Sequence, residues 1–202
     1  MAKKDGTQDL RITRTLRLIK EAFYDLIREK GFENITVKDI TERAMISRNT
    51  FYLHYADKFE LLNKQCDELM RTLFFNVGRQ LRTVQKKDLT VDGIASVISH
   101  GIRTVDGDKE YYSILLNDAS SDILTNKMTN TIKSSLEYIR KDIVQLNDFQ
   151  LTYIVSGMTG LIKYYVTNGV DDIDEECRIF TNLHLSKLIE LGELNHRGTK
   201  NE

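Results

Sequence analysis

The 202-residue sequence contains no proline, no tryptophan and only two cysteines. Cys66 and Cys177 lie far apart without a partner pattern, so neither a disulfide framework nor a thiolate metal site is suggested. Stretches of sustained two-residue alternation are scarce, and most apolar residues recur at helical spacing. These absences predict an all-α protein with no metal and no cofactor.

Long apolar runs are also missing. No stretch of 18 apolar residues occurs, and the N-terminus "MAKKDGTQDLRITR" is charged and has no apolar core of the kind found in signal peptides. We therefore expect a cytoplasmic protein with no membrane partner.

Neither sign of charge dominates, since the formal net charge is -1. Residues 1–58, however, contain 12 Lys and Arg against 9 Asp and Glu, while residues 59–202 contain 17 against 21. Any nucleic-acid surface must therefore be local, and the N-terminal part is where the cations are in excess.

Helical spacing and capping residues divide the chain. A first helix is predicted over residues 10–30 and ends at Gly31, with Leu16, Ile19, Phe23, Leu26 and Ile27 on its apolar stripe. A capping box at Thr36 begins a short second helix that ends near Ala44, Ser47 caps a third, and Asp57 begins a fourth. Two short helices joined by a tight turn form a helix-turn-helix. Further helices are expected over 91–105, 108–117, 121–146, 148–168 and 173–192.

The third helix carries more polar side chains than a packed helix can bury. Arg48 can pair with guanine and Asn49 with adenine in the major groove of DNA, whereas the single donors of Thr50, Tyr52 and His54 suit phosphates. Lys58 in the first turn of the fourth helix, together with Thr36 and Lys38, would add phosphate contacts. Phe51, Ile46, Leu53 and Tyr55 are the packing candidates. The alternative is a solvated amphipathic helix in an ordinary bundle.

The string "GFENITVKDITERAMISRNTFYLHYADKFELL" resembles the N-terminal DNA-binding domain of the TetR/AcrR family of regulators over about residues 10–62. More weakly, "YYSILL" and "SGMTGLIKYYVTNG" are similar to the ligand domain of a Firmicute-type branch. The resemblance implies about nine helices, a helix-turn-helix domain over 1–58 and an effector-binding and dimerisation domain over 59–202. It also implies a set of DNA-binding residues: Thr36, Lys38, Ser47, Arg48, Asn49, Thr50, Tyr52, His54 and Lys58.

One position departs from the family pattern. Members often have glycine in the turn where this chain has Met45, and a left-handed conformation is costly for methionine. Either Met45 accepts that strain or the turn differs slightly.

A helix-turn-helix protein pairs two copies to contact enough base pairs, so a dimer interface is expected. The last two predicted helices are its candidates, through Gly157, Gly160, Leu161, Phe180, Leu183 and Leu188. Two glycines inside a helix need a reason, because each costs up to about 1 kcal/mol relative to alanine. Close packing within one copy, or a kink, is the alternative to close packing between copies.

By resemblance, the middle helices would hold a cavity for an unknown small-molecule effector. Its candidate lining is Cys66, Phe74, His100, Tyr111, Tyr112 and Tyr138, and for each of them a plain core role is the alternative. We expect a homodimeric, ligand-responsive repressor of a double-stranded DNA operator; a TetR-like activator or protein-binding co-regulator is the alternative. No common catalytic motif occurs, so an enzyme is not expected.

Overall fold

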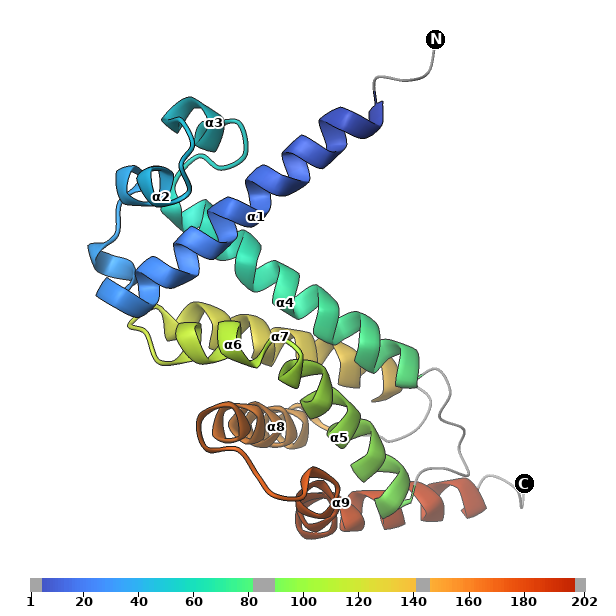
Figure 1. Ribbon diagram of the computed structural model, residues 1–202. Coiled ribbons are helices and arrows are strands. Elements are labelled where there is room, and N and C mark those ends of the chain that lie inside the picture. Colours follow the sequence, from blue (N-terminus) through green and yellow to red (C-terminus); the bar gives the residue numbers. More distant parts are fainter. Residues whose placement is uncertain (1–4, 82–89, 141–145, 199–202) are drawn as a thin grey trace. The chain divides into compact units, whose positions relative to one another are not determined.

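The computed structural model describes residues 5–81, 90–140 and 146–198, and its side chains are described over 9–80, 90–137, 146–184 and 186. Within those residues the chain forms nine α-helices and one 3-10 turn, without a strand (Figure 1). The all-α expectation is confirmed.

The chain divides into two compact units. Unit 1 comprises Met1–Glu68 and Ser113–Leu124, and unit 2 comprises Leu69–Tyr112 and Thr125–Glu202. The division therefore passes between Glu68 and Leu69, inside the helix expected to begin the second domain, and not at residues 58 and 59. A short segment from the middle of the chain joins the N-terminal unit.

Unit 1 is built on α1 (Asp5–Lys30), the 3-10 turn η1 (Phe32–Asn34), α2 (Val37–Arg43), α3 (Arg48–Tyr52) and the first part of α4 (Lys58–Leu81). Helix α1 packs against α2, and α2 packs against α3. The apolar stripe predicted for α1 is confirmed for Ile19, Phe23, Leu26 and Ile27, which are all buried. Aromatic and aliphatic side chains of the other elements complete this core, namely Phe32, Ile40, Phe51, Tyr55 and Leu61.

The residues predicted to begin and end these helices do so. Gly31 follows α1 with φ 77°, a conformation that glycine adopts without a Cβ penalty. Thr36 and Asp39 form a reciprocal capping box at the start of α2. Ser47 caps α3 and Asp57 accepts a hydrogen bond from the backbone N–H of Glu60 at 2.8 Å, so each local signal is confirmed.

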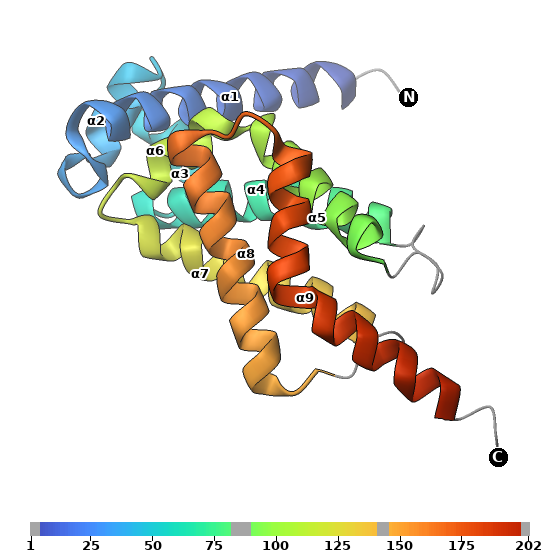
Figure 2. The same ribbon diagram turned by 90° about the horizontal axis from the view of Figure 1, so that it is seen from below.

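Unit 2 contains α5 (Val91–Asp106), α8 (Asp148–Asn168) and α9 (Ile173–Gly198), with parts of α4, α6 (Lys109–Leu116) and α7 (Ser121–Arg140). Helix α5 packs most extensively against α9 and also contacts α8. Figure 2 shows α8 and α9 side by side. Arg103 of α5 pairs with Asp174 of α9 at 2.9 Å, and Cys177 of α9 is buried.

The C-terminal helix bounds agree with prediction to within a few residues, with two exceptions. Helix α7 was expected to reach residue 146, but it is described to Arg140 and residues 141–145 lie outside the described chain. Helix α9 continues to Gly198 rather than ending near 192. None of the described helices combines the length and apolarity needed to span a bilayer.

Candidate nucleic-acid interface

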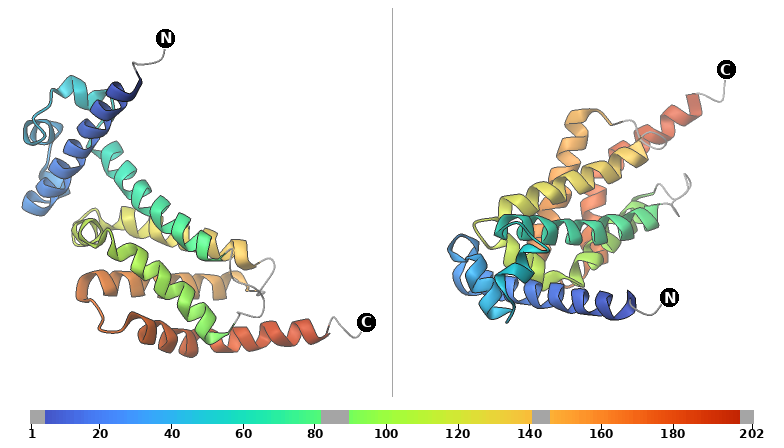
Figure 3. Two further views of the ribbon diagram at one scale, coloured as in Figure 1. Left: turned by 45° about the vertical axis from the view of Figure 1, so that its right-hand side comes forward. Right: turned by 90° about the horizontal axis from the view of Figure 1, so that it is seen from above.

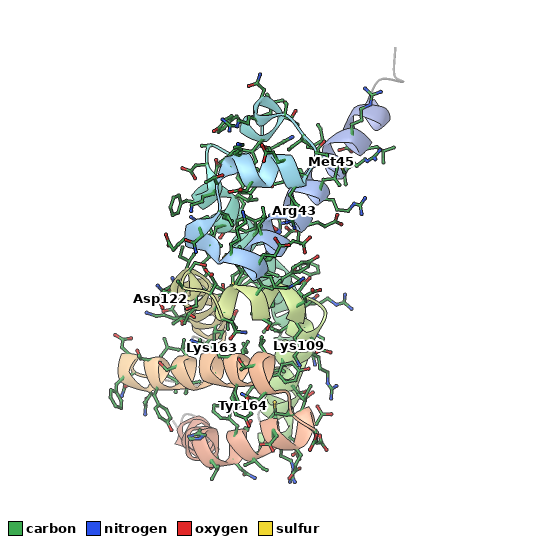
Figure 4. All side chains as sticks on the ribbon, turned by 60° about the vertical axis from the view of Figure 1, so that its left-hand side comes forward. Arg43, Met45, Lys109, Asp122, Lys163 and Tyr164 are labelled. Carbon is green, nitrogen blue, oxygen red and sulfur yellow. The ribbon has the colours of Figure 1, made fainter. Side chains whose placement is uncertain are left out.

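The turn between α2 and α3 depends on Met45. Its φ is 53°, which makes it the one non-glycine residue with positive φ in the described chain, and its side chain is 86% exposed (Figure 4). Of the two alternatives left open by the sequence, the turn keeps its geometry and Met45 takes the strained conformation. A left-handed conformation costs a residue with a Cβ about 1–2 kcal/mol.

Helix α3 is short and is held at both ends. The Ser47 hydroxyl accepts a hydrogen bond from the backbone N–H of Thr50 at 3.0 Å and lies 2.8 Å from the Thr50 hydroxyl. Phe51 is fully buried, and its ring centroid lies 5.5 Å from that of Tyr55. Because one side of a five-residue helix is fixed in the core, its other side chains must face outward.

Arg48 and Asn49 occupy that outward side. Both are exposed, and among the described residues no acidic group pairs with Arg48. Tyr52 is 54% exposed and His54 is half-buried, with its backbone carbonyl bound by Lys64 at 2.9 Å. The arrangement leaves a guanidinium and a carboxamide free at the start of α3, which are the groups that pair with purine edges.

Leu53 was expected to pack in the core, and that expectation was wrong. Its side chain is 81% exposed. The helix ends at Tyr52, and Leu53 is its C-cap, so helical periodicity no longer applies at this position. Ile46 is half-buried, while Phe51 and Tyr55 are buried as expected.

Lys58 has a different place from the one expected. Its ammonium donates to the backbone carbonyls of Phe32, Glu33 and Ile35, each at 3.0 Å, and lies 4.7 Å from the centroid of the Phe32 ring. An ammonium has three N–H donors, so this geometry leaves none for a phosphate. Lys58 is thus bound to the turn η1 and to Ile35, which follows it, and its ammonium faces these carbonyl groups.

Thr36 and Lys38 lie at the start of α2, where both side chains are exposed. The Thr36 hydroxyl donates to Asp39 at 2.7 Å, and Lys38 pairs with Glu42 at 3.8 Å across one helical turn. The Lys38 pair is solvent-exposed and is weak enough for a phosphate to displace. Hydrogen bonds from the side chain and backbone of Thr36, and then one from Lys30, lower the pKa of Asp39 to about 2.

Helix α2 is fixed to α1 by ion pairs. Arg43 makes two hydrogen bonds to Glu29, at 2.8 and 2.7 Å, and Lys30 contacts Asp39 at 3.2 Å. A bidentate guanidinium–carboxylate pair fixes orientation as well as distance. These contacts set the angle at which α2, and through it α3, is presented.

Asp118 is a residue that the sequence analysis did not single out. It lies in the polar segment after α6, and its carboxylate accepts hydrogen bonds from the backbone N–H groups of Phe32 and Ser120, at 3.0 and 2.9 Å. Burial favours the neutral acid, but the bonds from Ser120, Phe32 and Ala119 outweigh it and lower the pKa of Asp118. An aspartate two residues before a serine at a helix start was the available local signal.

The expected effector residues differ in burial, and one of them lines a groove of the described structure. Cys66 and Tyr112 are buried in the core, and Tyr112 donates to the Leu69 carbonyl at 3.4 Å. Phe74 is 50% exposed, Tyr111 is half-buried, and the side chain of Tyr138 lies outside the described residues. His100 alone of the described set lines an open groove of about 620 Å³ in unit 2, which also contains Thr72, Asn76, Arg79, Arg103 and Asp108.

The expected dimer residues fall into two groups. Gly157 is explained within one copy, because a Cβ there would lie 3.2 Å from the Phe180 ring of α9. Gly160 instead faces open space, Leu161 is half-buried, and Leu183 is 74% exposed. The side chain of Leu188 lies outside the described residues. Close intramolecular packing therefore accounts for one glycine and not for the other.

No three His, Cys, Asp or Glu side chains in the described part of the chain come together as a metal site. Cys66 and His100 belong to different units.

Comparisons with known proteins agree with this geometry. Residues 19–64 match the family described as bacterial regulatory proteins, tetR family. YxbF of Bacillus subtilis (strain 168), an uncharacterized HTH-type transcriptional regulator, is 40% identical over 73 residues, which are 34% of this chain and 19% of YxbF. An uncharacterized HTH-type regulator of Haemophilus influenzae is 24% identical over 163 residues, which are 78% of this chain and 76% of that protein.

Among solved structures, a TetR transcriptional regulator from Streptococcus agalactiae 2603V has the same fold, with a TM-score of 0.61 and 22% identity over 86% of this chain and 94% of that one. The relatives are named as transcriptional regulators, which agrees with the expectation that this chain is not an enzyme.

Proposed function

This chain belongs to the TetR family of bacterial regulatory proteins, and from that premise we propose that it represses transcription by binding a palindromic operator as a homodimer. A small molecule would release it from DNA. One observation carries the proposal: a Ser47-capped helix, fixed by the buried Phe51, presents Arg48 and Asn49 to solvent without an acidic partner for the arginine in the described chain.

The proposed DNA contacts are of two kinds. Arg48 would bind the O6 and N7 of a guanine, and Asn49 the N6 and N7 of an adenine, because these groups match in geometry. Phosphate contacts, which set register without selecting sequence, are assigned to Thr36, Lys38, Ser47, Thr50, Tyr52 and His54. Lys58 would support this surface indirectly, by holding η1 against the start of α4.

The proposed homodimer uses the exposed apolar side chains of α8 and α9. Phe149 is 82% exposed, Tyr153 53% and Tyr164 58% on α8, and Leu183 is 74% exposed on α9. Along α8 these residues share a face with the exposed Ser156 and Gly160, where a partner helix can approach closely. Neighbouring apolar side chains left exposed in this number support a protein interface.

The proposed effector site is the groove between α4 and α5 in unit 2. Arg79, His100 and Arg103 supply hydrogen-bond donors along it, and Asp108 adds a carboxylate. This lining is polar and charged, unlike the mainly aromatic lining expected from the sequence, and it suits a polar effector. An effector would act by binding more tightly to the form of the dimer that does not fit DNA.

Selecting binding sites from random duplexes tests the proposal directly. We expect enrichment of a palindrome with half-sites separated by about one helical turn, since a two-fold dimer presents two copies of α3. Failure to enrich any duplex at low ionic strength would contradict the proposal. A reporter gene placed behind the selected site then separates repression from activation.

Two substitutions assign the base contacts. Arg48→Ala should cost about 1–3 kcal/mol of binding free energy in each half-site of the selected palindrome and relax the preference at one guanine there, and Asn49→Ala should do the same at one adenine. Arg28→Ala is the matched control, because Arg28 is an exposed arginine of the same unit, paired with Asp25 at 3.6 Å near the other end of α1. Equal losses for all three variants on every duplex would refute these roles.

A further inference from the structure

Helix α1 begins well before the core of unit 1. It starts at Asp5, yet its first buried residue is Ile19, and every described side chain from Asp9 to Leu18 is exposed or half-buried. Isolated helical turns of this length are marginal in water, because helices of globular proteins are stabilised mainly by packing of one face. The early turns of α1 therefore lack the usual source of helix stability.

The charges on these turns make the helix less stable still. Arg11, Arg14 and Arg17 are all exposed, and cations in the first turns of a helix oppose its macrodipole. Arg17 pairs with Glu21 at 3.2 Å, but no acidic side chain in the described chain pairs with Arg11 or Arg14. Two guanidinium groups are thus available to an anionic partner.

The position of these groups identifies the partner. Helices α1 and α3 belong to the same unit, and the N-terminal turns of α1 project beyond α2 and α3 (Figures 1 and 3). Arg11 lies about 12 Å along the helix axis from Ile19, at 1.5 Å per residue. Half or more of protein–DNA hydrogen bonds go to phosphates and sugars, so exposed guanidinium groups on the unit that carries α3 are suited to the sugar-phosphate backbone of the same duplex.

We propose that Arg11 and Arg14 bind phosphates of the same duplex that α3 contacts, so that the exposed turns of α1 form a second, sequence-independent part of the DNA interface. The binding groups are the two arginine side chains, and the backbone amides of the helix terminus have no part in it. The proposal rests on the proposed function, because it takes α3 as the element that faces DNA.

The test is the salt dependence of DNA binding by the full chain. Wild type and an Arg11→Ala/Arg14→Ala double variant are titrated with the selected operator and with a scrambled duplex of the same length. Each lost phosphate contact removes about 0.9 from the slope of log K against log[salt]. The proposed homodimer carries both substitutions twice, so the loss of four contacts should make the variant's slope shallower by about 3.6. Between about 50 and 200 mM salt, wild type should lose about 150-fold more affinity than the variant, on both duplexes alike.

Two control variants separate charge from helix loss. Arg11→Lys/Arg14→Lys keeps both cations and should bind with the wild-type slope, and Arg28→Ala removes an exposed arginine at the far end of α1 and should also leave the slope unchanged. Circular dichroism of each variant shows whether α1 remains helical. If both alanine and lysine variants lose affinity together, the effect is structural and the proposal is wrong.

The remaining outcomes distinguish this proposal from the proposed function. An unchanged slope with retained operator preference would overturn the α1 contact and leave the proposed function standing. A shallower slope without any operator preference in wild type would support the α1 contact and contradict operator recognition. A loss confined to the operator would mean base contacts rather than phosphate contacts, and no binding of wild type to either duplex would overturn both proposals.

Discussion

The carboxylate of Asp118 accepts a hydrogen bond from the backbone N–H of Phe32 at 3.0 Å, although 86 residues separate them in sequence. Phe32 follows Gly31, which has a φ of 77°, and a Cβ built on Gly31 would lie 3.3 Å from a carboxylate oxygen of Asp118. The segment after α6 is thereby attached to the end of α1, inside unit 1.

Asp118→Ala should lower the free energy of unfolding by about 1–3 kcal/mol, because it leaves the N–H of the buried Phe32 without an acceptor. Urea denaturation followed by circular dichroism measures the change. Asn117→Ala, which removes an exposed side chain beside it, is the control and should change stability little. An effect no larger than the control would show that water replaces the carboxylate without loss.

Met45→Gly should stabilise the protein by about 1 kcal/mol. Glycine removes the Cβ that makes φ 53° costly, and the gain is partly offset by the greater entropy of glycine in the unfolded chain. Met45→Ala keeps the Cβ and should show no such gain. If the alanine variant is stabilised as much as the glycine variant, the exposed apolar side chain and not the backbone conformation is the cause.

Lys58→Ala should destabilise unit 1 and leave the salt dependence of DNA binding as it is in wild type. Three carbonyl groups lose their donor, two of them partly buried, which costs about 1–3 kcal/mol. Lys38→Ala should leave stability nearly unchanged and, because the proposed homodimer loses two phosphate contacts, make the salt slope of DNA binding shallower by about 1.8. Titration over salt together with thermal unfolding of both variants decides between structural and phosphate roles.

The environment of Asp39 should make the stability of the protein sensitive to acid. Its pKa falls from 3.8 to about 2 on folding, owing to the hydrogen bonds from Thr36 and Lys30. Because the folded-state pKa is lower than the unfolded one, the ionised Asp39 stabilises the folded protein fully above pH 3.8. This contribution to the free energy of unfolding is lost as the pH falls toward 2. Unfolding measured over this range should show less pH dependence in Asp39→Asn than in wild type, and identical curves would contradict the capping-box assignment.

Leu183→Asp should convert the proposed homodimer to monomers. Burying a leucine contributes about 1.5–3 kcal/mol, and a two-fold interface contains the substitution twice. The dissociation constant of the dimer should therefore rise by about 100-fold or more. Sedimentation velocity over a range of concentrations reports the change. Phe75→Asp is the control, since Phe75 is a 65% exposed aromatic residue of α4, away from α8 and α9. Dimers of equal strength in both variants would place the interface elsewhere.

Local chemistry explains which parts of the fold were predictable. Gly31, Thr36 and Ser47 fix helix ends through their own backbone or side chain, so their effect can be inferred from a few neighbouring letters. The apolar stripe of α1 follows from helical periodicity in the same way. The burial of Leu53 was predicted wrongly, because α3 has only five residues and ends before Leu53, so helical periodicity does not apply there.

Long-range contacts explain what was not predictable. Lys58 binds carbonyls that precede it by 23 to 26 residues, and a carbonyl acceptor has no signature in the sequence. Gly157 packs against Phe180 of another helix of the same chain. A stripe of small residues in the sequence predicts close packing, but it does not say whether the neighbour belongs to the same chain or to a partner. The aromatic residues expected around an effector differ in burial because residue type does not say which side of a helix lines a groove.

Cys66 and Cys177 are both buried, at 0% and 1% exposure, and burial followed by the nearby carboxylate of Asp174 raises the pKa of Cys177 to about 11. Thiolates are the reactive form, so neither native sulfur should react readily with maleimides while the protein is folded. A single cysteine placed at an exposed site such as Arg11 would then take up a fluorophore selectively. The native sequence is in this sense already prepared for site-specific labelling, with no background thiol to remove.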